Sequence, residues 1–133
     1  MMQKTAESLA YIKFLRLVQE VQTHHDLTAL SPMEERLLNL LALAWAQDQK
    51  ITVTQAMDFV AEISQSTSHR LLKVLRLKKF IALQVDEEDN RIKYVEPAEK
   101  ANLYFKALGT CIDRARQDVS LAGATASFES MPR

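Results

Sequence analysis

The segment "SQSTSHRLLKVLRLKKF", residues 64–80, is the most informative stretch of this 133-residue chain. It carries five basic residues and no acidic residue, although the formal charge of the whole chain is zero. The basic residues are Arg70, Lys73, Arg76, Lys78 and Lys79. None of the 17 acidic residues of the chain lies between Ile63 and Val85. Positive charge is thus gathered in one place.

The spacing of this segment predicts an amphipathic helix over residues 64–79, with Ser64 as its N-cap. Its apolar side consists of Leu71, Leu72, Val74 and Leu75. On another face, at i, i+4, i+8 and i+11, follow Gln65, His69, Lys73 and Arg76. One side of this helix can therefore pack on a core while the other presents positive charge to a partner.

An N-terminal helix over about residues 3–25 is apolar on more than one side. One stripe consists of Leu9, Ile12, Leu15 and Val18, and a second of Tyr11, Phe14 and Val21. A helix that packs only within its own domain needs a single apolar face. The second stripe therefore predicts a partner surface, most simply the same region of a second copy.

Two further helices are expected before the basic segment. Ser31, Pro32 and Glu34 predict a helix start with a capping box. After a loop over residues 47–51, Thr52 or Thr54 can cap a short helix that extends to residue 62. Its core residues would be Ala56, Phe59 and Val60.

A β-hairpin and a long helix follow the basic segment. "FIALQV" and "RIKYVE" have the character of strands, and "DEEDN" between them is typical of a turn. Pro97 begins a last helix, predicted to end at about residue 121. Residues 123–133 are small and polar without periodicity, so we expect a disordered tail there.

The composition disfavours several classes of protein. Cys111 cannot form an intrachain disulfide, and its apolar neighbours indicate packing rather than a redox switch. The start of the chain does not resemble a secretory signal, and the apolar run over residues 37–46 is too short to span a membrane. We therefore expect a cytoplasmic protein without contact with a membrane.

No cofactor, metal site or catalytic site is expected. His24, His25 and Asp26 are poorly placed to converge on a metal, and three or four ligands cannot be assembled from this sequence. The two glycines of the chain leave little material for a phosphate-binding loop, and no catalytic triad or convergent pair of acids is present. The chain is therefore not expected to be an enzyme.

The order of the predicted elements is that of a winged helix-turn-helix. From residue 30 to about residue 105 the chain resembles the MarR family of dimeric bacterial transcription regulators. The matching motifs are "LSPMEERLLNLLALA", "ITVTQAMDFVAEIS", "SQSTSHRLLKVLRLKKFI" and "VDEEDNRIKYVEP". Asp89 and Arg91 end the acidic turn of the last motif in the Asp-x-Arg pattern of the family.

The resemblance and the residues together predict a mainly α protein with a small β-hairpin wing. In it, a winged helix-turn-helix is flanked by N- and C-terminal dimerisation helices. We expect a single domain over residues 1–122. Its DNA-binding lobe would span about 30–97, and its dimerisation helices about 3–25 and 97–121.

The chain departs from the family pattern in three places. Ala61 and Glu62 stand in the turn where the family usually has Gly, with one residue more than the usual spacing. Lys79 stands where a Gly commonly ends the recognition helix in the left-handed conformation, which a non-glycine residue adopts at some cost. The wing over residues 86–92 is more acidic than most, so its tip would contribute less to DNA affinity.

The function expected is that of a sequence-specific regulator, most simply a dimeric repressor, which binds double-stranded DNA with helix 64–79 in the major groove. The start of that helix would read bases, Lys73 and Arg76 would contact phosphates, and Arg91 would approach the minor groove with Asp89 as its orienting partner. The DNA-binding residues expected are Gln65, Ser66, Thr67, His69, Arg70, Lys73, Arg76 and Arg91.

Three alternatives remain open from the sequence. A basic helix face can be merely solvated, and a winged helix can serve as a protein–protein interaction module with weak or no DNA binding. The third is a protein that binds a small-molecule effector without contacting DNA. The resemblance also implies a pocket for a small-molecule effector, for which Tyr11, Phe14, Trp45, His24 and His25 are candidate residues.

Overall fold

The computed structural model describes the backbone of residues 1–24 and 30–130, and the side chains of residues 1–23 and 30–117. The chain forms two compact units, one from Met1–Leu27 with Tyr104–Arg133 and the other from Thr28–Leu103. The second unit contains the lobe that the sequence predicts over about residues 30–97. Within the described part, no helix is both long and apolar enough to cross a membrane.

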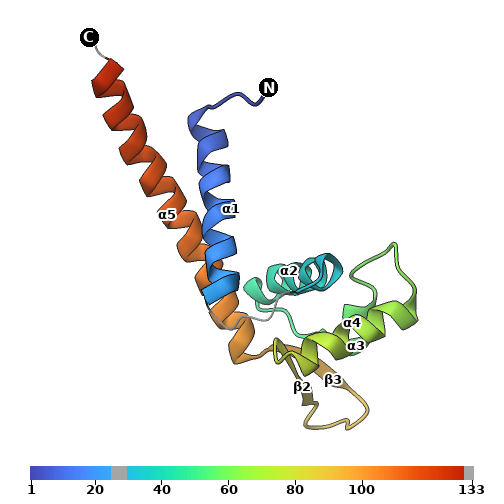
Figure 1. Cartoon of the computed structure of the whole chain (residues 1–133). Helices are drawn as coiled ribbons and strands as arrows, with labels where there is room; N and C mark the ends of the chain where they lie inside the picture. Colours follow the sequence, from blue (N-terminus) through green and yellow to red (C-terminus); the bar gives the residue numbers. More distant parts are fainter. Residues whose placement is uncertain (25–29, 131–133) are drawn as a thin grey trace. The chain divides into compact units, whose positions relative to one another are not determined.

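The first unit is a pair of antiparallel helices, α1 (Ala6–His24) and α5 (Glu99–Ser130), which lie side by side (Figure 1). Buried Leu17 of α1 packs with Cys111 and Ala115 of α5, and the partly buried Phe14, Val18 and Val21 surround them. The buried face of α1 therefore mixes the two predicted stripes: Phe14 and Val21 come from the second stripe and Val18 from the first, while Leu17 belonged to neither. Leu9 and Leu15 of the first stripe are exposed.

The last helix is longer than the sequence predicts. Residues 123–130, for which we expected no structure, continue α5 as far as Ser130. Alanine has the highest helix propensity, and this segment contains Ala124 and Ala126 and directly follows Ala122. Adding residues to an existing helix also needs no new nucleation. Residues 131–133 of the expected tail lie outside the described residues.

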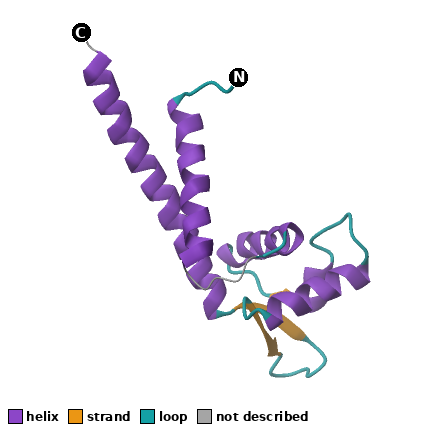
Figure 2. Cartoon of the chain, viewed as in Figure 1, coloured by secondary structure: helices purple, strands orange, loops and turns teal. Residues whose placement is uncertain are grey.

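The second unit contains three helices and a small antiparallel sheet (Figure 2). Its elements are α2 (Pro32–Ala46), β1 (Ile51–Thr52), α3 (Val53–Met57), α4 (Gln65–Leu77), β2 (Ile81–Val85) and β3 (Lys93–Pro97). The strand order is β1-β3-β2, with Leu83 opposite Val95 in the hairpin. Its most deeply buried side chains are Leu37, Leu38, Leu41, Leu75, Phe80 and Val95.

Local hydrogen bonds explain where the helices of this unit begin. The capping box predicted at Ser31 is present, because its hydroxyl accepts from the Glu34 amide at 3.2 Å and its own amide donates to the Glu34 carboxylate at 3.3 Å. Thr52 rather than Thr54 caps α3, in a second capping box. Ser64 caps α4, as predicted, by accepting from the Thr67 amide at 3.2 Å.

Three sequence predictions about this region were wrong. Pro97, predicted to begin the last helix, is instead the last residue of β3 and pairs with Ile81, and α5 begins at Glu99. The helix predicted to reach residue 62 ends at Met57, because the amides of Asp58 and Phe59 bond to carbonyls three residues back and the chain then turns away. The predicted loop over residues 47–51 ends in strand β1, whose two residues pair with Val95 and Tyr94 of β3. A strand of two residues has no periodicity that a sequence could reveal.

Helices α2 and α4 end in the same way. The amide of Phe80 bonds to the Leu75 carbonyl and that of Lys79 to the Arg76 carbonyl, which is the Schellman arrangement, and the end of α2 repeats it. This arrangement requires one residue in the left-handed region, and Lys79 has a φ of 68° and Asp48 a φ of 58°. The strained position expected at Lys79 is confirmed.

Candidate nucleic-acid interface

Helix α4 has the two sides that its sequence predicts. Leu71, Leu72 and Leu75 are buried, and Val74 is half-buried. On the other side the exposed side chains are Gln65, His69, Arg70, Lys73 and Arg76. Helix α4 packs on α2, α3 and β2, and its buried leucines lie on the side away from the exposed cations.

The cations on the exposed side of α4 have no acidic partner. Among the described residues, no carboxylate forms an ion pair with Arg70, Lys73 or Arg76. Their charge is therefore not neutralised by an ion pair within the described part of the chain and can attract an anionic partner.

Lys78 belongs to the same basic segment but has a different role. Its ammonium group donates to the Glu34 carboxylate of α2 at 2.5 Å, and both side chains are largely withdrawn from water. Burial disfavours the charged form of Glu34, but hydrogen bonds from Lys78 and Ser31 outweigh it and lower the pKa of the carboxyl. Lys78 thus ties the end of α4 to the start of α2 and is not part of the exposed cationic face.

At the first turn of α4, the polar side chains are engaged with neighbouring residues. The hydroxyl of Ser64 bonds to those of Ser66, at 3.1 Å, and Thr67, at 2.9 Å. Thr67 is half-buried, so its predicted contact with DNA is less accessible than that of Ser66. Gln65 donates its side-chain amide to the Asp58 carboxylate at 2.7 Å.

A groove lies between α4 and the wing. A hollow of about 250 Å³ is lined by His69, Lys73 and Arg76 of α4 over an apolar floor that includes Leu72 and Leu83. It adjoins a wider hollow of about 510 Å³, to which Arg91 also contributes. The structure thus brings three predicted residues of α4 together with the predicted residue of the wing.

Three polar residues of this groove were not predicted. They are Thr52 and Thr54, at the start of α3, and Lys93 of β3. Their hydroxyl and ammonium groups suit contact with phosphate oxygens. The alternation of side chains along β3 could have indicated from the sequence that Lys93 is exposed. The two threonines could not have been found in this way, because only the position of α3 against the sheet brings them to the groove.

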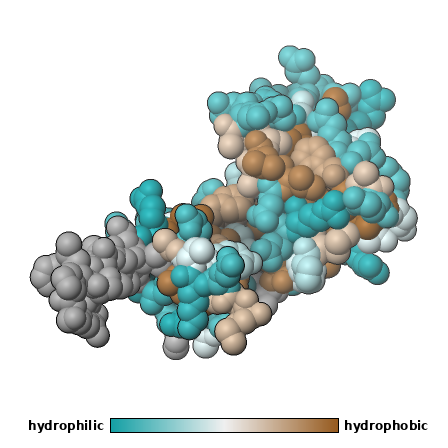
Figure 3. Space-filling model, turned by 90° about the horizontal axis from the view of Figure 1, so that it is seen from above, coloured by the Kyte–Doolittle hydropathy of each residue, from teal (hydrophilic) through white to brown (hydrophobic). Residues whose placement is uncertain are grey.

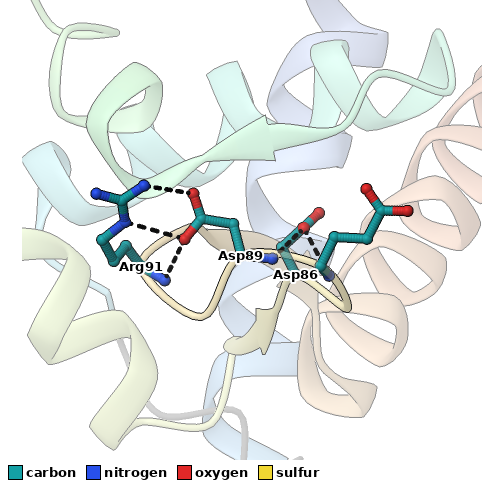
Figure 4. Close-up of polar contacts among 4 residues, drawn as sticks. Asp86, Asp89 and Arg91 are labelled. Atoms are coloured by element: carbon teal, nitrogen blue, oxygen red, sulfur yellow. Dashed lines mark hydrogen bonds and ion pairs between the residues drawn. The ribbon is translucent and has the colours of Figure 1, made fainter.

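Arg91 is held against the wing by Asp89. The Asp89 carboxylate accepts from Nε and Nη2 of Arg91, each at 3.1 Å, and from the Arg91 backbone amide at 3.0 Å (Figure 4). The hydrogen bonds from Arg91 lower the pKa of Asp89, and the same contact raises the pKa of Arg91. The Arg91 side chain is nevertheless 90% exposed, so it remains accessible to a partner.

Asp86 organises the turn of the wing. Its carboxylate accepts from the Tyr94 hydroxyl at 2.9 Å and from the backbone amides of Glu88 and Asp89 at 3.0 and 2.9 Å. Figure 4 shows the Asp86 carboxylate directed at those two amides. The bond from Tyr94 lowers the pKa of Asp86 most, and it raises the pKa of Tyr94. The acids of the wing thus shape the turn that carries Arg91.

Other candidate residues have structural roles. The Trp45 indole donates to the Val95 carbonyl at 3.0 Å and so joins α2 to the sheet. Burial raises the pKa of the Cys111 thiol, which packs against Leu17 as expected. Within the described part of the chain no group of three potential metal ligands occurs; His25 and Asp26 lie outside it.

Comparison with known proteins supports the fold. No model of a protein family matches the sequence, and no curated protein matches it either. Among solved structures, a DNA complex of MepR from S. aureus has a TM-score of 0.65 at 17% identity, covering 94% of this chain and 87% of MepR. The transcriptional regulator Tm0710 from Thermotoga maritima has a TM-score of 0.61 at 9% identity, with 91% and 79% covered.

A third similar structure is the heme sensor protein PefR from Streptococcus agalactiae in complex with heme. Its TM-score is 0.53 at 16% identity, with 98% of this chain and 95% of PefR covered. All three proteins are winged-helix regulators of the MarR family. The mainly helical fold with a small β-hairpin wing, predicted from the order of the sequence motifs, is confirmed, and the third strand β1 joins the hairpin in the structure. The chain therefore has the winged helix-turn-helix fold of the MarR-family transcriptional regulators.

Proposed function

We propose that this protein is a sequence-specific DNA-binding transcriptional regulator, most simply a repressor that occludes a promoter. The observation that carries the proposal is the exposed face of α4, where Arg70, Lys73 and Arg76 have no acidic partner among the described residues. The similarity to MepR, which has been solved with DNA, supports it. An enzymatic function has no such support, since the similar structures are regulators.

Within this proposal, the residues of the face divide by position. Gln65, Ser66 and Arg70 lie near the start of α4, the part of a recognition helix that contacts base edges. Lys73 and Arg76 lie further along and, with His69, border the groove towards the wing, where phosphates would pass. Arg91 would approach the adjacent minor groove.

A homodimer is part of the proposal. Figure 3 shows apolar surface (brown) between hydrophilic regions (teal). The exposed apolar side chains of the first unit include Tyr11 at 60%, Leu15 at 41% and Ile112 at 56%. Tyr11 and Leu15 are four residues apart and share one face of α1. A second copy that covers these residues would give two α4 helices for two half-sites, about one helical turn of DNA apart.

A small-molecule effector is a further part of the proposal. MepR has been solved with ethidium bromide and PefR with heme, so regulators of this fold accept aromatic ligands of different size. A bacterial regulator of this kind would act in the cytoplasm, where its DNA lies. Titration with ethidium and heme, followed by intrinsic Trp45 fluorescence and by release from DNA, tests for an effector site.

The decisive experiment is DNA binding as a function of salt. Fragments selected from random DNA by the purified protein should share a two-fold symmetric motif, and affinity should fall steeply between about 50 and 200 mM salt. Lys73→Ala should weaken binding to all sequences and reduce the salt slope by about one for each phosphate that the variant no longer neutralises. Arg116→Ala, which removes one positive charge from α5, is the matched control and should bind as the unmodified protein does.

A second candidate function is a protein–protein interaction module. It is favoured by the acidic side of the wing, where Asp86, Glu87, Glu88 and Glu96 line a hollow of about 420 Å³. Such a module would bind DNA weakly, without a selected motif and without response to Lys73→Ala. That result would contradict the proposed regulator and favour the interaction module.

A further inference from the structure

The side chain of Gln65 is positioned before any DNA is bound. Gln65 is the first residue of α4, and its Nε2 donates to the Asp58 carboxylate at 2.7 Å. Asp58 is the C-cap residue of α3, so the bond spans the turn between the two helices. Both side chains are exposed, and no cation pairs with Asp58 among the described residues.

The hydrogen-bonding chemistry of the two groups determines the orientation of the Gln65 side-chain amide. An ionised carboxylate only accepts hydrogen bonds, so Asp58 must face the NH₂ group of the amide and not its oxygen. One Nε2 hydrogen is used by Asp58. The other hydrogen and the Oε1 oxygen remain free for a partner.

A free donor next to a free acceptor matches one base edge in the major groove. Glutamine recognises adenine by donating to N7 and accepting from the N6 amino group, whereas guanine presents two acceptors there. We propose that Asp58 is a positioning residue for specificity, which presets Gln65 to read adenine at one position of each half-site. This inference rests on the proposed DNA-binding function.

The charge of Asp58 supports a role in specificity rather than in affinity. An unpaired carboxylate at the base-reading end of α4 repels the DNA phosphates and so weakens binding to every sequence. Glu62 lies in the same turn, but its charge is balanced by Arg36 at 3.0 Å. If Asp58 only stabilised the turn, a basic residue could balance its charge, as Arg36 balances that of Glu62, without any loss of function.

Asp58 also has a structural effect that the test must separate. A negative charge is stabilising near the start of α4 but unfavourable at the end of α3, so removal of Asp58 would change the stability of the fold by itself. A loss of stability changes the amount of folded protein and affects all DNA sequences alike. A change of base preference at a single position is not expected from it.

The experiment compares selected DNA motifs. The full-length protein and the variants Asp58→Ala, Asp58→Asn, Gln65→Ala and Glu62→Ala are each presented with random DNA, and thermal unfolding confirms that each is folded. Gln65→Ala identifies the base position that Gln65 reads. At that position Asp58→Ala should reduce the preference for adenine about tenfold. A double variant that combines Asp58→Ala with Gln65→Ala should lose no more of the preference than Gln65→Ala alone.

The remaining variants give the controls. Asp58→Asn keeps an acceptor of similar shape but can also donate, so it should retain only part of the preference. Glu62→Ala removes an acid from the same turn and should leave the adenine preference unchanged. The inference is overturned if Asp58→Ala keeps the full preference, or if Gln65→Ala alters no position, while salt-dependent binding to a symmetric motif persists. Absence of any such binding by the unmodified protein would instead overturn the proposed function, and this inference with it.

Discussion

At the scale of the residue, Lys79 has a backbone conformation that is unfavourable for a residue with a side chain. Its φ of 68° lies in the left-handed region, in which an L side chain is strained and glycine is not. Lys79→Gly should therefore raise the free energy of unfolding by about 1 kcal/mol, as measured by urea denaturation.

Lys79→Ala is the control for this change. Alanine removes the same positive charge but keeps the Cβ that causes the strain, so it should give little or no stabilisation. Equal stability of the two variants would show that the charge, and not the backbone conformation, determines the effect at this position. Asp48, with a φ of 58°, offers a second test of the same kind at the end of α2.

At the scale of the element, one ion pair, between Lys78 and Glu34, joins the end of α4 to α2. The pKa of Glu34 is lowered in the folded protein from its ordinary value of 4.5. The ion pair therefore stabilises the fold fully when the pH is above 4.5, and this stabilisation is lost as the pH falls through the lower pKa of the folded state. Glu34→Gln should lower the free energy of unfolding at pH 7 by about 1 to 3 kcal/mol. The difference between variant and unmodified protein should narrow below about pH 4.

The exposed pair of Arg36 and Glu62 is the matched control. The two side chains are 49% and 64% exposed, so solvent weakens the attraction between their charges. Glu62→Gln should change stability little at any pH. A similar loss in both glutamine variants would contradict a special role for the contact between Glu34 and Lys78.

The wing is a second element with a predicted pH dependence. Asp86 and Asp89 have lowered pKa values, so their hydrogen bonds persist above the ordinary value of 3.8 and are lost as the pH falls through the lower, folded values. In NMR titrations the amide signals of Glu88 and Asp89 should therefore stay constant from pH 7 to about pH 5 and shift in stronger acid.

Asp86→Ala reproduces the loss of these bonds at neutral pH. The amides of Glu88 and Asp89 should then exchange with solvent faster, because both lose their acceptor. Glu87→Ala removes an exposed acid of the same turn for which no such bond to these amides occurs, and exchange should be unchanged. Constant exchange rates in Asp86→Ala would show that Asp86 does not organise the turn.

At the scale of the whole molecule, two copies are needed to read a symmetric site. Ile112→Glu places a charge on the exposed apolar side of α5 and should convert the proposed dimer to a monomer in sedimentation experiments. Two linked contacts bind far more tightly than one, so affinity for the selected motif should fall at least about 100-fold. Leu43→Glu, at a position 66% exposed on α2, is the control and should leave the dimer intact.

The sequence by itself determined the elements whose chemistry is local. Ser31 and Ser64 cap helices because their hydroxyls reach amides only three residues ahead. The leucines and the cations of α4 separate onto two sides because helical geometry fixes their relative directions. The hairpin followed from two apolar runs and the acidic turn between them. In each case the interacting groups are close in the chain, so the pattern of residues suffices.

Only the tertiary structure decided which charges of the basic segment are free. Lys78 is paired with Glu34, a residue 44 positions away, and the Gln65 amide is turned towards Asp58 across the turn. The short strand β1 exists because β3 offers it a free edge, and Thr54 reaches the groove because α3 lies beside the sheet. These contacts join groups that the chain brings together only on folding, so no local pattern of residues encodes them.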